Sequence, residues 1–151
     1  QNDDLVRVNA SELLNEIVGQ MLSVGLPSGS GVQVEQSFEP IKIDADDAAP
    51  LTLLVSEALT NALKYVSTVE HGKGFISLKL IQTGPEQAMI EVRNTIGNPE
   101  EVKSGTGLGS RLILAFTRQL NGQVEVETTD GVYQIRVNFH VPTDSKMVYD
   151  Y

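Results

Sequence analysis

The sequence contains no cysteine. That absence excludes disulfide bonds, zinc sites built from thiolates and cysteine nucleophiles, and it is compatible with a reducing compartment. No apolar run reaches the roughly 20 residues that a membrane-spanning helix needs. The first ten residues, QNDDLVRVNA, have neither the basic region nor the apolar core of a signal peptide. We therefore expect a cytoplasmic protein without direct membrane contact from this domain.

Basic residues are also scarce. The chain has 11 Lys and Arg against 20 Asp and Glu, and its net charge is −9. A nucleic-acid surface needs clustered Lys and Arg, so we expect no nucleic-acid partner. A chain of 151 residues with 40% hydrophobic residues is long enough for one globular core. We expect a single domain over residues 1–142 and a flexible tail over residues 143–151.

The most regular pattern is the stretch LTLLVSEALTNALKYV, residues 51–66. Its apolar residues recur at helical spacing and predict a central helix with one broad buried face. Glu57, Asn61 and Lys64 follow at i, i+4 and i+7, so they share one polar flank. A carboxamide oxygen suits Mg²⁺, an ammonium neutralises phosphate, and a carboxylate orients water or takes a proton. A solvated helix face gives the same stripe, so this pattern alone does not decide function.

A second pattern is the stretch SGTGLGSRLIL, residues 104–114. Gly105, Gly107 and Gly109 alternate just before an apolar, helix-like run. Glycines allow backbone N–H groups to approach an anion, and the following helix adds partial positive charge at its N-terminus. The pairing predicts a phosphate cradle. It lacks the leading strand of a Rossmann fingerprint and the Lys-Ser/Thr ending of a P-loop.

Together the two stretches resemble a known family. Glu-x-x-x-Asn-x-x-Lys-Tyr at Glu57 to Tyr65, followed by Gly-x-Gly-Leu-Gly at Gly105 to Gly109, is similar to the N box and G2 box of the ATP-binding catalytic domain of sensor histidine kinases. That domain (HATPase_c, the Bergerat fold) belongs to the gyrase, Hsp90, kinase and MutL superfamily. The stretches SEALTNALKY and GLGSRLILAFTRQLNG resemble the HisKA_2/HWE-like branch most. The resemblance runs from about Asn9 to Pro142.

The resemblance implies ATP and Mg²⁺ as cofactors. In it, Asn61 holds Mg²⁺, Lys64 and Tyr65 approach the phosphates or the ribose, and Glu57 either polarises the acceptor or orients Asn61. The remaining implied nucleotide contacts are Asn94, Gly97, Gly105, Thr106, Gly107, Leu108 and Gly109. The implied partners are a histidine-bearing dimerisation domain, which supplies the phosphoacceptor, and a response regulator.

One box departs from the family pattern. Where the family usually has Asp-x-Gly-x-Gly, with an aspartate that accepts a hydrogen bond from the adenine amino group, this chain has RNTIGN. Asn94 takes the aspartate position, and only Gly97 remains nearby. A carboxamide oxygen still accepts from an amine without charge assistance, at a cost on the order of 1 kcal/mol. In the family's last box, Gly131 matches and Val132 stands where threonine is common.

The remaining patterns fix the fold class. A helix follows Asn9 or Ser11 as its cap, and strands are predicted over residues 32–38, 75–81, 88–92, 123–129 and 132–139. A further helix, with Leu108, Leu112, Ile113, Phe116 and Leu120 on one face that we expect to lie in the core, ends at Asn121-Gly122. We expect an α/β two-layer sandwich, a mixed and mostly antiparallel sheet with about three helices on one face.

Other residues with ligand chemistry have simpler interpretations. Asp44, Asp46 and Asp47 precede the central helix, where carboxylates complement the helix dipole, so capping is favoured over metal binding. His71 and His140 are read as ordinary surface histidines rather than phosphoacceptors.

Two alternatives to the kinase stay open. An anti-sigma-factor serine kinase of the same fold also resembles SEALTNALKY. A degenerate, ATP-independent docking or phosphotransferase module that binds a response regulator would account for the altered segment at Asn94 to Asn98.

Overall fold

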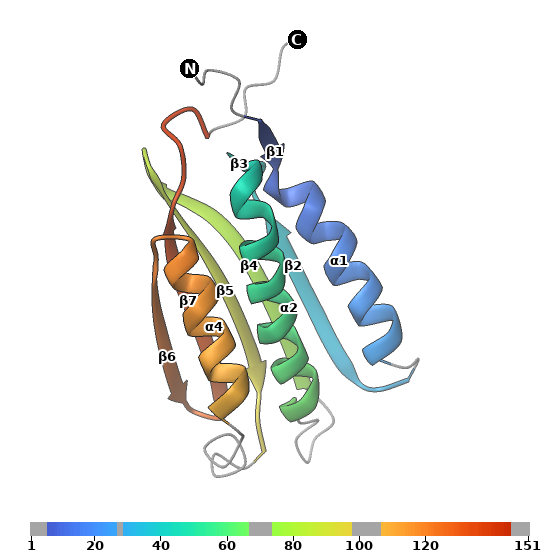
Figure 1. The fold of residues 1–151 in the computed structure, drawn as a ribbon. Coiled ribbons are helices and arrows are strands. Elements are labelled where there is room, and N and C mark those ends of the chain that lie inside the picture. Colours follow the sequence, from blue (N-terminus) through green and yellow to red (C-terminus); the bar gives the residue numbers. More distant parts are fainter. Residues whose placement is uncertain (1–5, 27–28, 67–73, 98–106, 146–151) are drawn as a thin grey trace.

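Three helices cover one face of a five-stranded sheet in the computed structural model, which describes residues 6–26, 29–66, 74–97 and 107–145 (Figure 1). For residues 107–110 the backbone alone is described. The elements are β1 (Arg7–Asn9), α1 (Ala10–Gly25), β2 (Val32–Phe38), β3 (Lys42–Asp44), the short 3₁₀ helix η1 (Ala45–Asp47), α2 (Ala48–Tyr65), β4 (Gly74–Gly84), β5 (Gln87–Thr95), α4 (Gly107–Gln119), β6 (Gln123–Thr129) and β7 (Val132–His140).

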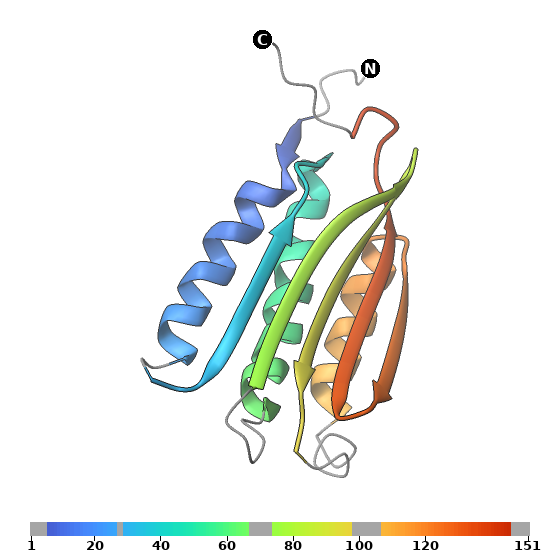
Figure 2. The same cartoon turned by 180° about the vertical axis from the view of Figure 1, so that it is seen from behind.

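The large sheet has the strand order β2-β4-β5-β7-β6. Strands β2 and β4 are parallel, and the other neighbouring pairs are antiparallel. Figure 2 shows the sheet from the side that no described helix covers. The predicted two-layer sandwich with a mixed, mostly antiparallel sheet is therefore confirmed. None of the helices within the described ranges is long and apolar enough to cross a lipid bilayer.

Helix α2 lies in the middle of the helix layer, between α1 and α4 (Figure 1). Its buried residues recur every three or four positions, which turns one face toward the sheet throughout. They are Pro50, Leu51, Leu54, Val55, Ala58, Leu59 and Ala62. Burying one leucine side chain contributes about 1.5–3 kcal/mol. The helix predicted to be central is therefore the one that holds both neighbouring helices and the sheet together.

The helix ends follow local chemistry. The Asn9 side chain accepts a hydrogen bond of 2.9 Å from the Ser11 N–H, which confirms the predicted cap of α1. Helix α4 ends at Gln119, and the turn that follows contains Asn121, whose φ of 54° is left-handed. The Gly122 N–H then bonds the Thr117 carbonyl at 2.9 Å. The β6–β7 hairpin turns at Asp130 and Gly131, with φ values of 52° and 77°, as the sequence predicts.

Gly122 is a position where a side chain has no room. A Cβ there would meet the backbone oxygen of Asn138, and it would lie 3.1 Å from the Phe139 Cβ. We expect Gly122→Ala to lower the free energy of unfolding by about 1–3 kcal/mol, because the end of α4 must move away from β7. Urea denaturation measures this loss. Gly19→Ala is the control: a Cβ at Gly19 in α1 meets nothing within 4 Å, and alanine should stabilise the helix by about 0.5–1 kcal/mol. Equal losses in both variants would contradict the prediction.

Asp47 stands at the start of α2 without making a side-chain cap hydrogen bond. Burial raises the pKa of its carboxyl above the ordinary 3.8, the charges of Asp44 and Asp46 raise it further, and His140 lowers it. A folded pKa above the unfolded value means that the folded state holds the proton more tightly. Stability therefore falls as the pH rises from about 3.8 through the raised pKa, and the cost is complete at neutral pH.

We expect Asp47→Asn to remove that cost. The free energy of unfolding should rise at pH 7 by less than about 1 kcal/mol, since a partly exposed charge is screened by water. Asparagine is also a good N-cap, so the helix start is preserved. Urea denaturation at pH 7 and at pH 3 measures the difference. The gain should vanish at pH 3, and a gain of equal size at both pH values would refute the electrostatic cause.

The uncovered sheet face carries paired charges. Residues opposite one another across the strands include Lys79, Glu91, Arg136 and Glu125. The Arg136 guanidinium donates to the Glu91 carboxylate at 2.8 Å. Glu91 is only 5% exposed, so the long side chains around it, rather than a second layer, keep it from water. This face is polar because the alternation of each strand places its apolar residues against the helices.

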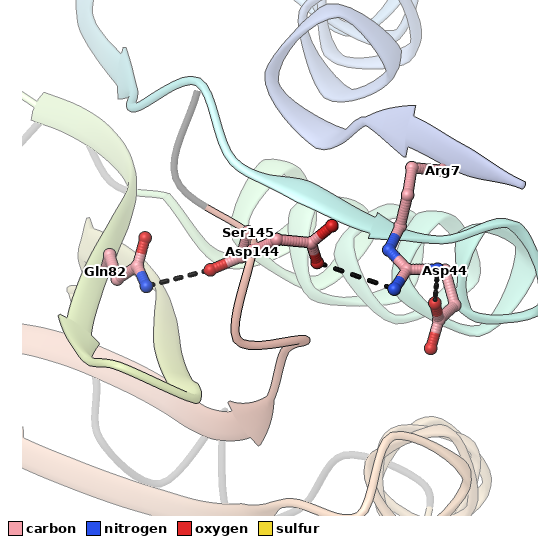
Figure 3. A network of polar contacts seen from close by, with 5 residues as sticks. All are labelled: Arg7, Asp44, Gln82, Asp144 and Ser145. Carbon is pink, nitrogen blue, oxygen red and sulfur yellow. Dashed lines mark hydrogen bonds and ion pairs between the residues drawn. The ribbon is translucent and has the colours of Figure 1, made fainter. Parts of the chain in front are cut away.

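A polar network ties distant segments together at the end of the molecule that carries β1 and β3 (Figure 3). Arg7 in β1 pairs with Asp44 at 2.7 Å and with Asp144 at 3.4 Å. Gln82 of β4 donates to the Ser145 hydroxyl at 2.8 Å, and Ser145 is fully buried. Strand β3 pairs with β1 in a separate two-stranded sheet. The domain boundary at residue 142 stays a prediction, and residues 146–151 lie outside the described residues.

Candidate functional site

The predicted polar stripe lies along one flank of α2. Glu57 and Asn61 are half-buried, and Lys64 is exposed. Within the described part of the chain, no side chain or backbone group is hydrogen-bonded to the Glu57 carboxylate or the Asn61 carboxamide. Both side chains are half-buried, so their polar atoms can bond water when no ligand is bound. These two groups are therefore available to a ligand.

The C-terminal end of α2 is fixed against the sheet by two backbone contacts. Val66, just after the helix, forms an isolated antiparallel bridge with Ile96, just after β5. The Ile96 N–H in turn donates to the Gly131 carbonyl in the β6–β7 turn at 2.9 Å. Three segments far apart in the sequence thus meet at one end of the molecule. The first turn of α4 lies at the same end (Figure 1).

Lys64 and Tyr65 occupy the last turn of α2 at this end. The Lys64 ammonium lies 5.1 Å from the centre of the Tyr65 ring, a cation–π distance. The ammonium thus lies over the face of the Tyr65 ring, and Lys64 is still exposed to solvent. The arrangement gives this end a fixed positive charge, which suits the predicted contact with phosphate.

Asn94 is the best-defined residue of the predicted base contact. It lies on β5 on the helix side of the sheet and is 1% exposed. Its Nδ2 donates to the Thr95 carbonyl at 3.1 Å. That bond uses the donor end of the carboxamide and leaves Oδ1 as an acceptor, to which no group of the described residues donates. Asn94 therefore presents an acceptor, as an aspartate at this position does.

The glycine loop is described only in part. Gly105 and Thr106 lie outside the described residues. Gly107, Leu108 and Gly109 form the first turn of α4, where backbone N–H groups have no partner inside the helix. An anion at this helix start is favoured by those N–H groups and by the helix dipole. Gly97 follows β5 and is exposed, two residues after Thr95.

Tyr133 joins this set, although the sequence did not single it out. It is the residue on β7 directly opposite Asn94, and its side chain is half-buried against the core. Burial raises the pKa of the Tyr133 hydroxyl, and the charge of Tyr65 raises it further, because the two phenols lie near each other. In the sequence, Tyr133 stands out only by its position in the alternating pattern of this strand. That pattern is equally compatible with a core residue and with a site residue.

The two histidines do not enter the site. His140 is exposed at the last position of β7, at the opposite end of that strand from Tyr133. His71 lies outside the described residues.

The residues present fit a nucleotide with a bound magnesium ion. The fit rests on two unpartnered polar groups on α2 and one buried acceptor on β5, all carried by the secondary structure of the domain. A carboxamide oxygen is a hard ligand suited to Mg²⁺, and a buried acceptor suits the amino group of a purine. Residues held on helices and strands keep this spacing better than loop residues do.

Solved structures with the same fold include several histidine kinases. The histidine kinase domain from the Erythrobacter litoralis EL346 blue-light activated histidine kinase superposes with a TM-score of 0.77 and 21% identity, over 89% of this chain and 62% of that chain. The mycobacterial sensor histidine kinase MprB gives 0.72 and 18%, over 91% of this chain and 98% of that one. Full-length ShkA in complex with AMPPNP gives 0.72 and 17%, over 94% and 32%. This chain thus spans less than two thirds of the first of these structures, and the likeness establishes the fold.

The sequence comparison is more specific. No curated protein sequence matches this chain. Residues 46–145 match the family of histidine kinase-, DNA gyrase B-, and HSP90-like ATPases. That range contains the polar stripe of α2, Asn94 and the glycine loop, so the match covers the whole candidate site. The chain, with its ATP-binding fold, therefore belongs to the family of histidine kinase-, DNA gyrase B-, and HSP90-like ATPases.

Proposed function

We propose that this domain is the catalytic part of a sensor histidine kinase, which transfers the γ-phosphoryl group of ATP to a histidine on an adjoining dimerisation domain. The observation that carries the proposal is the unpartnered stripe of Glu57 and Asn61 on α2, at the same face of the sheet as the buried acceptor of Asn94. The Glu57 and Asn61 groups lie beside the exposed Lys64 and have no hydrogen-bond partner among the described residues, so all three can contact one ligand.

Each side chain has a separate task in this proposal. The Asn61 carboxamide oxygen holds Mg²⁺, which when bound neutralises charge on the phosphates. Lys64, held over the Tyr65 ring, adds a positive charge near the phosphates or the ribose. The first turn of α4 offers its N–H groups to the phosphate chain, and Asn94 accepts from the adenine amino group. Phosphoryl transfer needs positioning and charge neutralisation more than covalent help, so this set suffices for the donor side.

Glu57 has two roles that the chemistry allows. One helical turn before Asn61, its carboxylate either polarises the acceptor or orients the Asn61 carboxamide. The acceptor itself comes from the dimerisation domain, because His140 lies at the far end of β7. We extend the proposal to a bacterial, cytoplasmic two-component kinase of the HisKA_2/HWE-like branch, with a response regulator as the next partner.

A nucleotide-free docking module is the alternative that the sequence of the base-binding segment suggests. The orientation of Asn94 argues against it. Its Nδ2 is bonded to the Thr95 carbonyl, and no described residue donates to its oxygen, so an acceptor remains for the amino group of a purine. The anti-sigma-factor kinase stays the other alternative, and it differs in phosphorylating a serine instead of a histidine.

The test has two stages. Calorimetric titration of ATP into this chain, with and without Mg²⁺, should give saturable binding that requires Mg²⁺. Incubation with ATP labelled at the γ-phosphate and a histidine-bearing dimerisation domain should then give a phosphoprotein that is labile to acid, as phosphohistidine is. An acid-stable product would indicate the serine kinase. No binding at millimolar ATP would favour the docking module.

A further inference from the structure

We propose that Tyr133 contacts the base of the bound nucleotide through its phenolic hydroxyl, beside Asn94, and that Tyr65 holds the Tyr133 phenol in place. The inference rests on the proposed nucleotide site. It assigns to that site a tyrosine that sequence patterns place in the core.

Strand register carries the first step. On β7, Val132 is opposite Thr95 and Tyr133 is opposite Asn94. Successive residues of a strand point to opposite faces, so Val132 lies on the uncovered face and Tyr133 lies on the helix face with Asn94. In an antiparallel pair the Cβ atoms of opposite residues are about 4.5–5.5 Å apart. The residue at position 133 is therefore the nearest neighbour of Asn94 on β7 that shares its face.

The second step is the environment of the phenol. Tyr133 packs against the core with its ring, yet its side chain is only half-buried. A tyrosine in such a place keeps its apolar ring inside and turns its hydroxyl toward a polar partner. Among the described residues no hydrogen bond to this hydroxyl is present. The hydroxyl is thus a donor and acceptor without a hydrogen-bond partner among the described residues, on the residue opposite Asn94.

The third step is the approach of Tyr65. The Val66–Ile96 bridge and the Ile96–Gly131 hydrogen bond bring the end of α2 to the start of β7, two residues from Tyr133. The two phenols are close enough for one charge to affect the other. Tyr65 follows Lys64 in the last turn of α2. It therefore lies between the residues proposed for the phosphates and those proposed for the base.

Asn94 and Tyr133 have complementary hydrogen-bonding ability. The Asn94 oxygen can only accept, since a carboxamide oxygen carries no hydrogen, and the Nδ2 of the same group donates to the Thr95 carbonyl. A phenol both donates and accepts. A purine edge presents a donor amine beside an acceptor ring nitrogen, so Asn94 takes the amine and Tyr133 donates to the ring nitrogen. The hydroxyl thereby compensates for the charge that an aspartate would supply at position 94.

Calorimetric titration of ATP into Tyr133→Phe, in the presence of Mg²⁺, tests the inference. Removing one hydroxyl that bonds the base should weaken ATP binding by about five- to tenfold. Tyr65→Phe should weaken it less, and the double variant should resemble Tyr133→Phe alone, because Tyr65 acts through Tyr133. Ser77→Ala, which removes a half-buried hydroxyl from the uncovered face of β4, is the matched control and should leave ATP binding unchanged.

Proton NMR of the tyrosine rings gives a second readout that a purely structural role would not produce. The Tyr133 ring signals should shift on addition of ATP and should stay in place with inorganic triphosphate, which has no base. Unchanged ATP affinity in Tyr133→Phe, or Tyr133 signals that respond equally to both compounds, would overturn the inference while the proposed function stands. Absence of ATP binding to the unaltered chain would instead refute the proposed function itself.

Discussion

Asn61→Ala is expected to remove Mg²⁺-dependent ATP binding while leaving the fold intact. Mutating a group that merely supports a metal ligand costs about 10–100-fold in affinity, so removing the ligand itself should cost at least about that much. The fold should not suffer, because Asn61 has no hydrogen-bond partner in the described structure and alanine is the better helix former. Titration of ATP with and without Mg²⁺ measures the binding, and thermal unfolding measures the stability.

The matched control is Asn15→Ala. Asn15 lies on the exposed face of α1, where its side chain accepts a hydrogen bond of 2.6 Å from Gln36. This variant also replaces a helical asparagine by alanine, but on a different helix from Asn61. We therefore expect its ATP binding to be unchanged. Binding that weakens equally in both variants would point to an effect on the fold. If Asn61→Ala bound ATP with unchanged affinity and Mg²⁺ dependence, Asn61 would not be a ligand of the metal.

Asn94→Leu should weaken ATP binding by at least about tenfold. Leucine is close to asparagine in size but has no acceptor, so the adenine amino group would be buried without a partner. The variant also removes the hydrogen bond from the Asn94 Nδ2 to the Thr95 carbonyl, and the free energy of unfolding should fall by about 1 kcal/mol. Because the two effects are separate, binding should be measured well below the unfolding temperature of the variant.

Asn94→Asp distinguishes the two effects. Aspartate keeps an acceptor for the base and adds charge, so ATP binding should be retained or tightened. It also places an oxygen against the Thr95 carbonyl, so the fold should be less stable than that of the unaltered protein. If Asn94→Asp lost ATP binding while remaining folded, Asn94 would not be the residue that reads the adenine amino group.

The sequence predicted the element types well because their signals are local. The periodicity of residues 51–66 gave the central helix, and alternation gave the strands that became β2, β4, β5, β6 and β7. Turn residues with left-handed backbone, Asn121 and Asp130, were recognisable because few residue types adopt that conformation. Predicted ends differed from the observed ends by a few residues, since helix and strand termini depend on contacts outside the element.

Burial within an element was harder to predict. Leu112 was assigned to the buried face of its helix, but it is 36% exposed. Thr117 is buried instead, and its hydroxyl bonds the Ile113 carbonyl at 2.7 Å. The helical pattern shows which residues share a face, but the tilt of α4 against β6 and α2 decides how far that face extends.

The sequence by itself determined the family and the helix that carries Glu57, Asn61 and Lys64, and it suggested the residues that we propose for phosphate and metal. Those features depend on spacing along one helix or one loop, which is fixed by backbone geometry. The tertiary structure alone decided that Glu57 and Asn61 have no hydrogen-bond partner among the described residues, that the Thr95 carbonyl orients Asn94, and that Tyr133 lies opposite Asn94. These facts depend on strand register and on the contact of α2 with β5 and β7. Contacts between residues tens of positions apart are set by packing and hydrogen bonding across the sheet, which no local pattern encodes.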